Sequence, residues 1–185
     1  MQVEILLKIN KYKNDMKANQ LTTSEYNEWF TPYISTLSDE NLIEEFEISL
    51  HRFIRFVQDI SLDKHDFAYA PGKWTIKDII QHLIDCERIL SYRALCIARN
   101  DKTNFPSFND ESYAKEAKGN TKSLMNLLTE LTSLRQSTLL LFKSFSNDEL
   151  LRIGTSSDSP ISVRALGFII IGHQNHHQKI FLEKY

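Results

Sequence analysis

Apolar side chains recur every three or four residues over long parts of the chain, which is the period of an α-helix with one buried face. Four of these parts are long enough for full helices, and they cover residues 38–60, 75–100, 121–145 and 162–185. No part keeps the strict alternation of a half-buried strand. The pattern therefore predicts an all-α fold, a four-helix bundle, in which the connections are of unequal length.

Capping residues support the predicted helix starts. Ser38 can cap the first helix, and Ser162 can cap the last. Thr75 and Asp78 approximate a capping box at the start of the second helix. The stretch "SNDE" at 146–149 is a further capping box and predicts a short extra helical turn.

The segments outside the four helices divide into an extension and two loops. Residues 1–37 are expected to be an N-terminal extension that packs on the bundle, within a single domain covering residues 1–185. Pro32 is expected to interrupt any helix there. The connection at 101–120 is longer than most in bundles and is a candidate functional or lid-like loop. "RIGTSSDSPIS" is predicted to be a loop.

Composition narrows the class of protein. Hydrophobic residues make up 42% and charged residues 25%, which is ordinary for a soluble globular protein. The net charge of −2 and the lack of a long basic stretch argue against nucleic-acid or anionic-membrane partners. No apolar run approaches the roughly 20 residues that span a bilayer. The first residues, "MQVEILLKINKYKND", lack the order and length of a signal peptide.

The two cysteines do not predict a disulfide. Cys86 and Cys96 are ten residues apart in one predicted helix, and this corresponds to a rise of about 15 Å, far beyond disulfide reach. Without a disulfide framework or an export signal, a cytoplasmic location is expected.

The last predicted helix contains three of the six histidines, in "IIIGHQNHHQKIF". At about 100° per residue, His173 and His177 are about 40° apart, in the middle of the apolar stripe. His176 falls about 60° to the other side, on the flank of the stripe, and is expected to face solvent or to play a supporting role. Paired histidines four residues apart on one face are found in helical metal sites. A buried histidine can equally be a hydrogen-bonded core residue, so both interpretations of the pair stay open.

The other histidines differ in their positions. His82 lies at the edge of the apolar face of the second helix, roughly 80° from its centre and beside Cys86. Such an edge position can converge with a central pair on a neighbouring helix, but spacing alone does not prove that they meet. His65 lies in a loop and is expected to be solvated, and His51 in the first helix has no indicated role.

Two long stretches, "APGKWTIKDIIQHLIDCERILSYRALCIARND" and "ISVRALGFIIIGHQNHHQKIFLEKY", closely resemble the DinB-like superfamily. The nearest branch is the DinB_2 group, with YfiT-type metal-dependent hydrolases and bacillithiol transferases. The resemblance runs from "EYNEWFTPYIS" to the end of the chain. It implies a four-helix bundle with one long crossover and one divalent metal ion bound by three histidines. Carried over to this chain, the implied metal ligands are His82, His173 and His177.

Three imidazoles leave a coordination position open, as in catalytic rather than structural zinc sites. Such a metal can lower the pKa of bound water to about 7 or bind a thiol as a nucleophile. Zinc and nickel both suit histidine ligands. Asp85 and Glu87 are candidates for supporting a ligand histidine, and ion pairs with Arg88 or Arg93 are the alternative. Cys86 is expected to be a packing residue.

Two functional hypotheses follow. The first is a metal-dependent enzyme, a thiol transferase or hydrolase, that acts on a small molecule such as a low-molecular-weight thiol. The second is a non-catalytic bundle whose metal serves a structural or stress-response binding role. Phe105, Phe108 and Tyr113 in the 101–120 connection would suit a ligand pocket, a hydrophobic plug or a homodimer contact. The sequence contains no phosphate-binding loop and no Ser-His-Asp arrangement.

Overall fold

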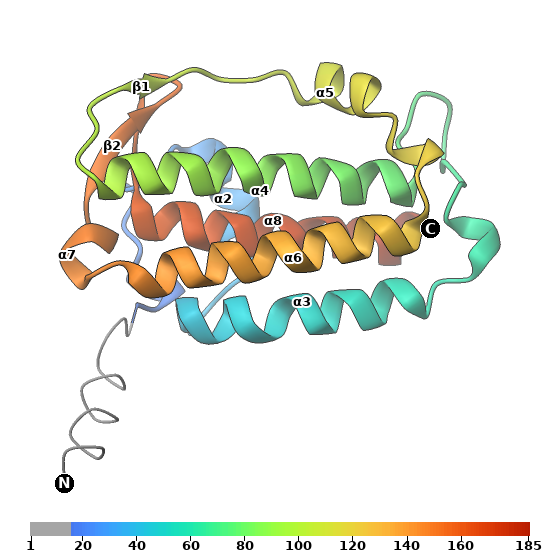
Figure 1. Cartoon of the computed structure of the whole chain (residues 1–185), viewed down its shortest axis with the longest axis horizontal. Coiled ribbons are helices and arrows are strands. Elements are labelled where there is room, and N and C mark those ends of the chain that lie inside the picture. The colour runs from blue at the N-terminus through green and yellow to red at the C-terminus, as the bar shows by residue number, and fades with distance from the viewer. Residues whose placement is uncertain (1–15) are drawn as a thin grey trace, which may run out of the picture.

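The structure, a computed structural model, describes residues 16–185, and the expectations for "MQVEILLKINKYKND" lie outside this range. Four long helices dominate the described part of the chain (Figure 1). They are α3 (Leu42–Gln58), α4 (Ile76–Ala98), α6 (Leu124–Ser144) and α8 (Val163–Lys184). No helix among these residues is long and apolar enough to cross a bilayer.

The order of the helices around the bundle explains the long connection. Both α3 and α4 pack against α6 and α8, so α3 and α4 occupy opposite corners. Helices α3 and α8 run in one direction, whereas α4 and α6 run in the other (Figure 1). Because α4 and α6 are parallel neighbours, the chain between them must return along the whole bundle. The expected four-helix bundle with a long crossover is therefore confirmed.

The crossover is more structured than a plain loop. It contains strand β1 (Asn104–Phe105), helix α5 (Asp110–Ala117) and a 3-10 turn at Gly119–Thr121. The predicted loop after α7 (Asn147–Leu150) is instead a hairpin of β2 (Ile153–Ser156) and β3 (Ser159–Ser162). Strand β1 pairs in parallel with β2, which ties the start of the crossover to the hairpin.

The prediction of a loop at "RIGTSSDSPIS" was wrong at this sheet, although the bundle itself is as expected. The strands of the sheet are two to four residues long, too short for an alternating pattern to stand out. The turn of the hairpin places Ser157 and Asp158 at φ values of 53° and 59°, in the left-handed region that such two-residue turns require.

The helix starts follow local capping chemistry. The predicted capping boxes at Thr75 and at Ser146 are present, and the Ser162 side chain accepts from the backbone N–H of Ala165. The first long helix begins later than expected, at Leu42, because the Asn41 side chain rather than that of Ser38 caps it. The third begins at Leu124, after Ser123.

The described part of the N-terminal segment, residues 16–41, lies against the first half and the middle of α8. It contains 3-10 turns at Ala18–Gln20 and Glu28–Phe30 and the short helix α2 (Thr31–Ile34). Pro32 does not interrupt this helix as expected, because it lies in the first turn, where a missing N–H is tolerated. A further 3-10 turn, Leu62–Lys64, lies between α3 and α4.

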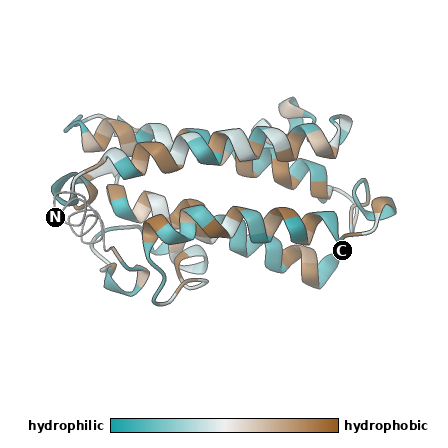
Figure 2. Cartoon of the chain, turned by 60° about the horizontal axis from the view of Figure 1, so that its bottom comes forward, coloured by the Kyte–Doolittle hydropathy of each residue, from teal (hydrophilic) through white to brown (hydrophobic). Residues whose placement is uncertain are grey.

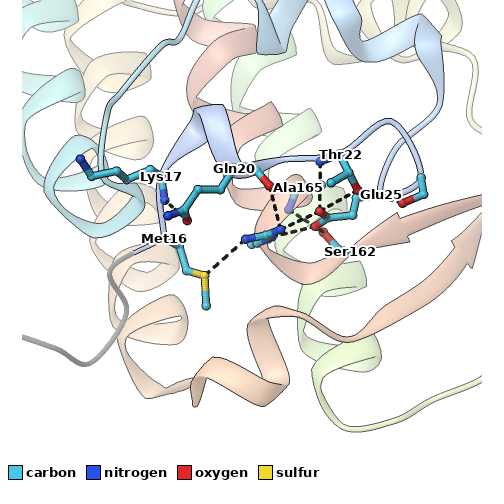
Figure 3. A network of polar contacts seen from close by, with 9 residues as sticks. Met16, Lys17, Gln20, Thr22, Glu25, Ser162 and Ala165 are labelled. Atoms are coloured by element: carbon cyan, nitrogen blue, oxygen red, sulfur yellow. Dashed lines mark hydrogen bonds and ion pairs between the residues drawn. The ribbon is translucent and has the colours of Figure 1, made fainter.

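A buried ion pair attaches this segment to α8 (Figure 3). The Arg164 guanidinium donates to both carboxylate oxygens of Glu25, at 2.7 and 2.6 Å. The Ser162 hydroxyl and the Thr22 backbone N–H donate to the same carboxylate. Burial raises the pKa of Glu25, but these hydrogen bonds and the arginine charge together hold it below its ordinary value.

The interior of the bundle consists of two hydrophobic clusters, and apolar residues recur along each long helix (Figure 2). A layer of buried polar side chains separates the two clusters. It includes the ion pair between Glu87 and Arg135, the Ser49 hydroxyl that accepts from Arg135, and Gln174. The histidines discussed next lie at this level of the bundle.

Candidate metal centre

Helices α4 and α8 bring three buried histidines together. His82 projects from α4, whereas His173 and His177 project from successive turns of α8. The Nε2 atom of His173 lies 3.1 Å from Nε2 of His82 and 3.0 Å from Nε2 of His177. Among the described residues, these three offer ligand atoms that all lie within 4.8 Å of one another.

The arrangement suits a metal ion better than a hydrogen-bond network. A neutral imidazole has either a proton or a lone pair at Nε2, so the His173 atom cannot bond well to both neighbours. Zinc–nitrogen bonds of about 2.0–2.1 Å in a tetrahedron place two nitrogens about 3.3 Å apart, close to the separations observed. The far nitrogen of His177, Nδ1, is buried without a hydrogen-bond partner. The chemistry of the donor set therefore fits one divalent cation with a coordination position left open.

Burial also sets the protonation of the cluster. It lowers the pKa of His82 to about 4, against a small opposing effect of Asp110. It lowers the pKa of His173 and His177 well below the ordinary histidine value, and the neighbouring histidines add to this effect. The rings are therefore neutral near pH 7, which is the form that binds metals.

Cys86 lies beside the cluster, with its Sγ 3.6 Å from Nδ1 of His82. Burial raises the pKa of this thiol to about 12, so it is protonated near neutral pH. A protonated thiol is a poor nucleophile.

Aromatic side chains cover the histidines on two sides. The ring centroid of Trp74, directly before the Thr75 cap, lies 4.8 Å from that of His82. Tyr33 of α2 lies 4.9 Å from His173 and 5.2 Å from the half-buried ring of His176. His176 thus contacts the covering tyrosine and lies outside the group of three.

Gly172 permits this cover to approach α8 closely. A Cβ atom on this residue would lie 2.3 Å from the backbone oxygen of Tyr33, well inside van der Waals distance. Any side chain here would push α2 away from the helix that carries His173.

The carboxylates near the cluster have other partners. Asp85 accepts a hydrogen bond from Gln81 at 2.9 Å and lies 3.7 Å from the Arg88 guanidinium. The ion pair with Arg88, one of the two roles considered for this residue, is therefore present. Glu87 pairs with neither Arg88 nor Arg93 but with Arg135 on α6. Arg135 was not predicted as the partner of Glu87, because spacing along one helix does not show which other helix packs against it.

The remaining histidines lie away from the site. His65 is buried, and its Nε2 lies 3.1 Å from the backbone oxygen of Ile60, so the expectation that it is solvated was wrong. His51 is exposed on α3.

A cavity of about 410 Å³ opens next to the cluster, with His82 and His173 in its wall. Its other residues come from the N-terminal segment, α4, the crossover, the hairpin and, with Ile169, from α8. They include the aromatic residues Trp29, Phe30, Tyr33 and Phe108 and the charged residues Arg93 and Asp110.

Sequence reasoning pointed to only part of this wall. Phe108 was expected to suit a pocket, whereas Phe105 is buried in the core and Tyr113 is largely exposed. Arg93 was missed as a cavity residue. Its spacing of eleven residues from His82, close to three helical turns, places both on one face and could have indicated it.

The chain is thus a helical bundle with a buried histidine cluster beside a cavity. Residues 45–181 match the model of the DinB superfamily, and the chain belongs to this superfamily. No curated protein matches it. A solved structure, YfiT from Bacillus subtilis, is similar at 15% sequence identity and a TM-score of 0.68, over 89% of this chain and 90% of that one. YfiT is described as a probable metal-dependent hydrolase with an unusual four-helix bundle topology.

Proposed function

We propose that this protein is a metal-dependent enzyme that binds one divalent ion, zinc or nickel, through His82, His173 and His177. The observation that carries the proposal is the convergence of three neutral imidazole nitrogens beside a cavity. Three protein ligands and an open position are typical of catalytic sites. The description of YfiT as a metal-dependent hydrolase supports the same class of function.

The substrate is a small molecule that occupies the cavity, and the reaction is hydrolysis or transfer of a thiol to an electrophile. A divalent metal supplies Lewis-acid chemistry for either reaction. The aromatic walls exclude water and position the substrate, while Asp110 is a carboxylate in the cavity wall that can accept a proton. Cys86 also lies in the cavity wall, but burial raises the pKa of its thiol, so we assign it a packing role beside His82.

Metal content tests the site directly. The wild type and the His173→Ala, His176→Ala and His51→Ala variants would be purified identically, loaded with zinc or nickel, desalted and analysed by elemental mass spectrometry. We expect about one ion per chain in the wild type and in the last two variants, and a loss in His173→Ala. Equal and negligible metal in the wild type and His173→Ala would refute the site. Loss in His176→Ala would show that the ligand pair is misassigned.

Turnover tests the enzyme class. The metal-loaded and metal-free proteins would be assayed for hydrolysis of an activated ester and for conjugation of cysteine to a chlorodinitrobenzene electrophile. Turnover that needs both the metal and His173 supports the proposal, and the active substrate distinguishes the two reactions. Stoichiometric metal with neither reaction favours the alternative, a bundle that binds metal without catalysis. The thiol substrate, the cytoplasmic location and a homodimer stay predictions from the sequence.

A further inference from the structure

Three arginines are buried in the described part of the chain, and two of them pair with a buried glutamate. Arg135 donates to Glu87 through two of its nitrogens, at 2.9 to 3.1 Å. Arg164 contacts Glu25 in the same two-point manner. These pairs follow the general rule that a charge removed from water needs an opposite charge close by.

Arg93 is the third and has no such partner. It is 6% exposed, and no carboxylate of the described residues lies within ion-pair distance of its guanidinium. One nitrogen donates to the backbone oxygen of Pro106 at 2.6 Å, and the guanidinium carbon lies 5.7 Å from the ring centroid of Phe108. These contacts fix the side chain in place but leave its charge uncompensated, and burial lowers its pKa.

The unpaired arginine is also the one that lines the cavity. Arg93 shares this wall with His82, His173 and the aromatic residues, whereas Arg135 and Arg164 do not reach it. The other charged residue of the wall, Asp110, lies beyond ion-pair distance of Arg93. The cavity therefore combines aromatic and aliphatic walls with several hydroxyl groups and one fixed, unpaired cation, a combination that suits an anionic ligand group. The Asp110 carboxylate of the same wall is exposed, so water solvates its charge.

We propose that Arg93 binds a carboxylate of the small molecule that occupies the cavity, so that the substrate is an organic acid with an apolar or aromatic body. The planar guanidinium can donate two parallel hydrogen bonds to a carboxylate. The aromatic walls then hold the rest of the molecule next to His82 and His173. The inference rests on the proposed function for the identity of this ligand as the substrate.

Benzoate and its neutral analogue benzamide test the inference. Binding would be measured by ligand-observed NMR titration on protein freed of metal with a chelator, because a carboxylate can also coordinate a metal. The variants are Arg93→Gln, Arg93→Lys and the control Arg88→Gln, which removes a half-exposed arginine of the same helix outside the cavity. Circular dichroism checks that each variant is folded.

We expect the wild type and Arg88→Gln to bind benzoate about tenfold more tightly than benzamide. Arg93→Gln should lose this preference and Arg93→Lys should keep part of it, whereas a merely structural arginine would leave the preference unchanged. Equal binding of the two probes by the wild type, or no binding of either, would overturn the inference. Should Arg93→Gln fail to fold, the wild-type comparison and Arg93→Lys still decide.

This test is independent of the metal proposal. Metal content of Arg93→Gln should equal that of the wild type, because Arg93 contacts none of the three histidines through any hydrogen bond or ion pair among the described residues. A protein without metal could still prefer benzoate, and a protein with metal could show no preference, so the two proposals fail separately.

Discussion

Replacing Glu87 with alanine should destabilise the protein strongly without removing the metal ion proposed for the histidine cluster. The carboxylate is 3% exposed and accepts three hydrogen bonds from Arg135, which is itself buried. In Glu87→Ala the guanidinium keeps the hydroxyl of Ser49, at 3.3 Å, and the ring of Phe46, 5.6 Å away. It also keeps a Coulombic attraction to the buried carboxylate of Glu45, but no hydrogen bond to it is present. Removing the hydrogen-bonded partner of a buried charge typically costs about 3–5 kcal/mol.

This loss is a large share of the roughly 5–15 kcal/mol by which folded proteins are usually stable. For a chain of this size, each kcal/mol shifts Tm by about 2–4 °C, so a fall of roughly 6–20 °C is expected. Thermal and urea unfolding followed by circular dichroism, with a chelator present, would measure it. Elemental analysis of the folded variant after metal loading should still find one ion per chain.

Two control variants show whether the loss of stability in Glu87→Ala comes from a buried, unpaired charge. Glu130→Ala removes the partner of Arg88 in a solvent-exposed pair and should cost about 1 kcal/mol or less. The double variant Glu87→Leu with Arg135→Leu removes both charges and should recover most of the stability. A loss below about 1 kcal/mol in Glu87→Ala would refute the argument from burial. Loss of metal at unchanged stability would instead assign the carboxylate to the histidine cluster.

Three further predictions concern the cluster and its cover. The pKa of His82 is about 4 in the folded state against an ordinary 6.5, so the unfolded chain binds protons first as pH falls. In metal-free protein, the free energy of unfolding should therefore be unaffected by this ring above pH 6.5 and should fall by about 3 kcal/mol between pH 6.5 and pH 4, as measured by urea unfolding across pH. A free energy of unfolding that stays constant over this range would contradict the burial of the ring. Saturating zinc, at 1,000 times Kd, should raise the free energy of unfolding by about 4 kcal/mol, a gain that His173→Ala should abolish. Gly172→Ala should cost about 1–2 kcal/mol, because crowding against Tyr33 outweighs the gain in helix propensity, and an unchanged or raised Tm would show that α2 shifts freely.

The local elements of the fold were predictable where they leave a periodic or capping signal in the sequence. The four long helices, the capping boxes at Thr75 and Ser146 and the Ser162 cap follow from residue spacing and local chemistry. The small sheet does not, because its short strands leave no pattern and are defined by pairing between β1 and β2, which are about fifty residues apart. Chain positions alone did not reveal that contact.

The candidate site also has features that the sequence predicts and features that only the folded structure shows. The angular positions on the last helix distinguish His173 and His177 from His176. The family resemblance, not the spacing, implied His82 as the third member, and the structure shows that its ring reaches His173. The partner of Glu87 and the burial of His65 depend on which helices and loops are neighbours, which is a property of the whole fold.

The position of the cavity wall relative to the family match has an evolutionary consequence. The match covers residues 45–181 and includes all three clustered histidines. Trp29, Phe30 and Tyr33, which form one side of the cavity, come from the segment before it. Substitutions in this segment can therefore change the shape of the cavity while leaving the histidines intact. A fragment cut at the family boundaries would keep Trp74 but lose the Tyr33 side of the cover, and it would be a poor reagent for identifying the substrate.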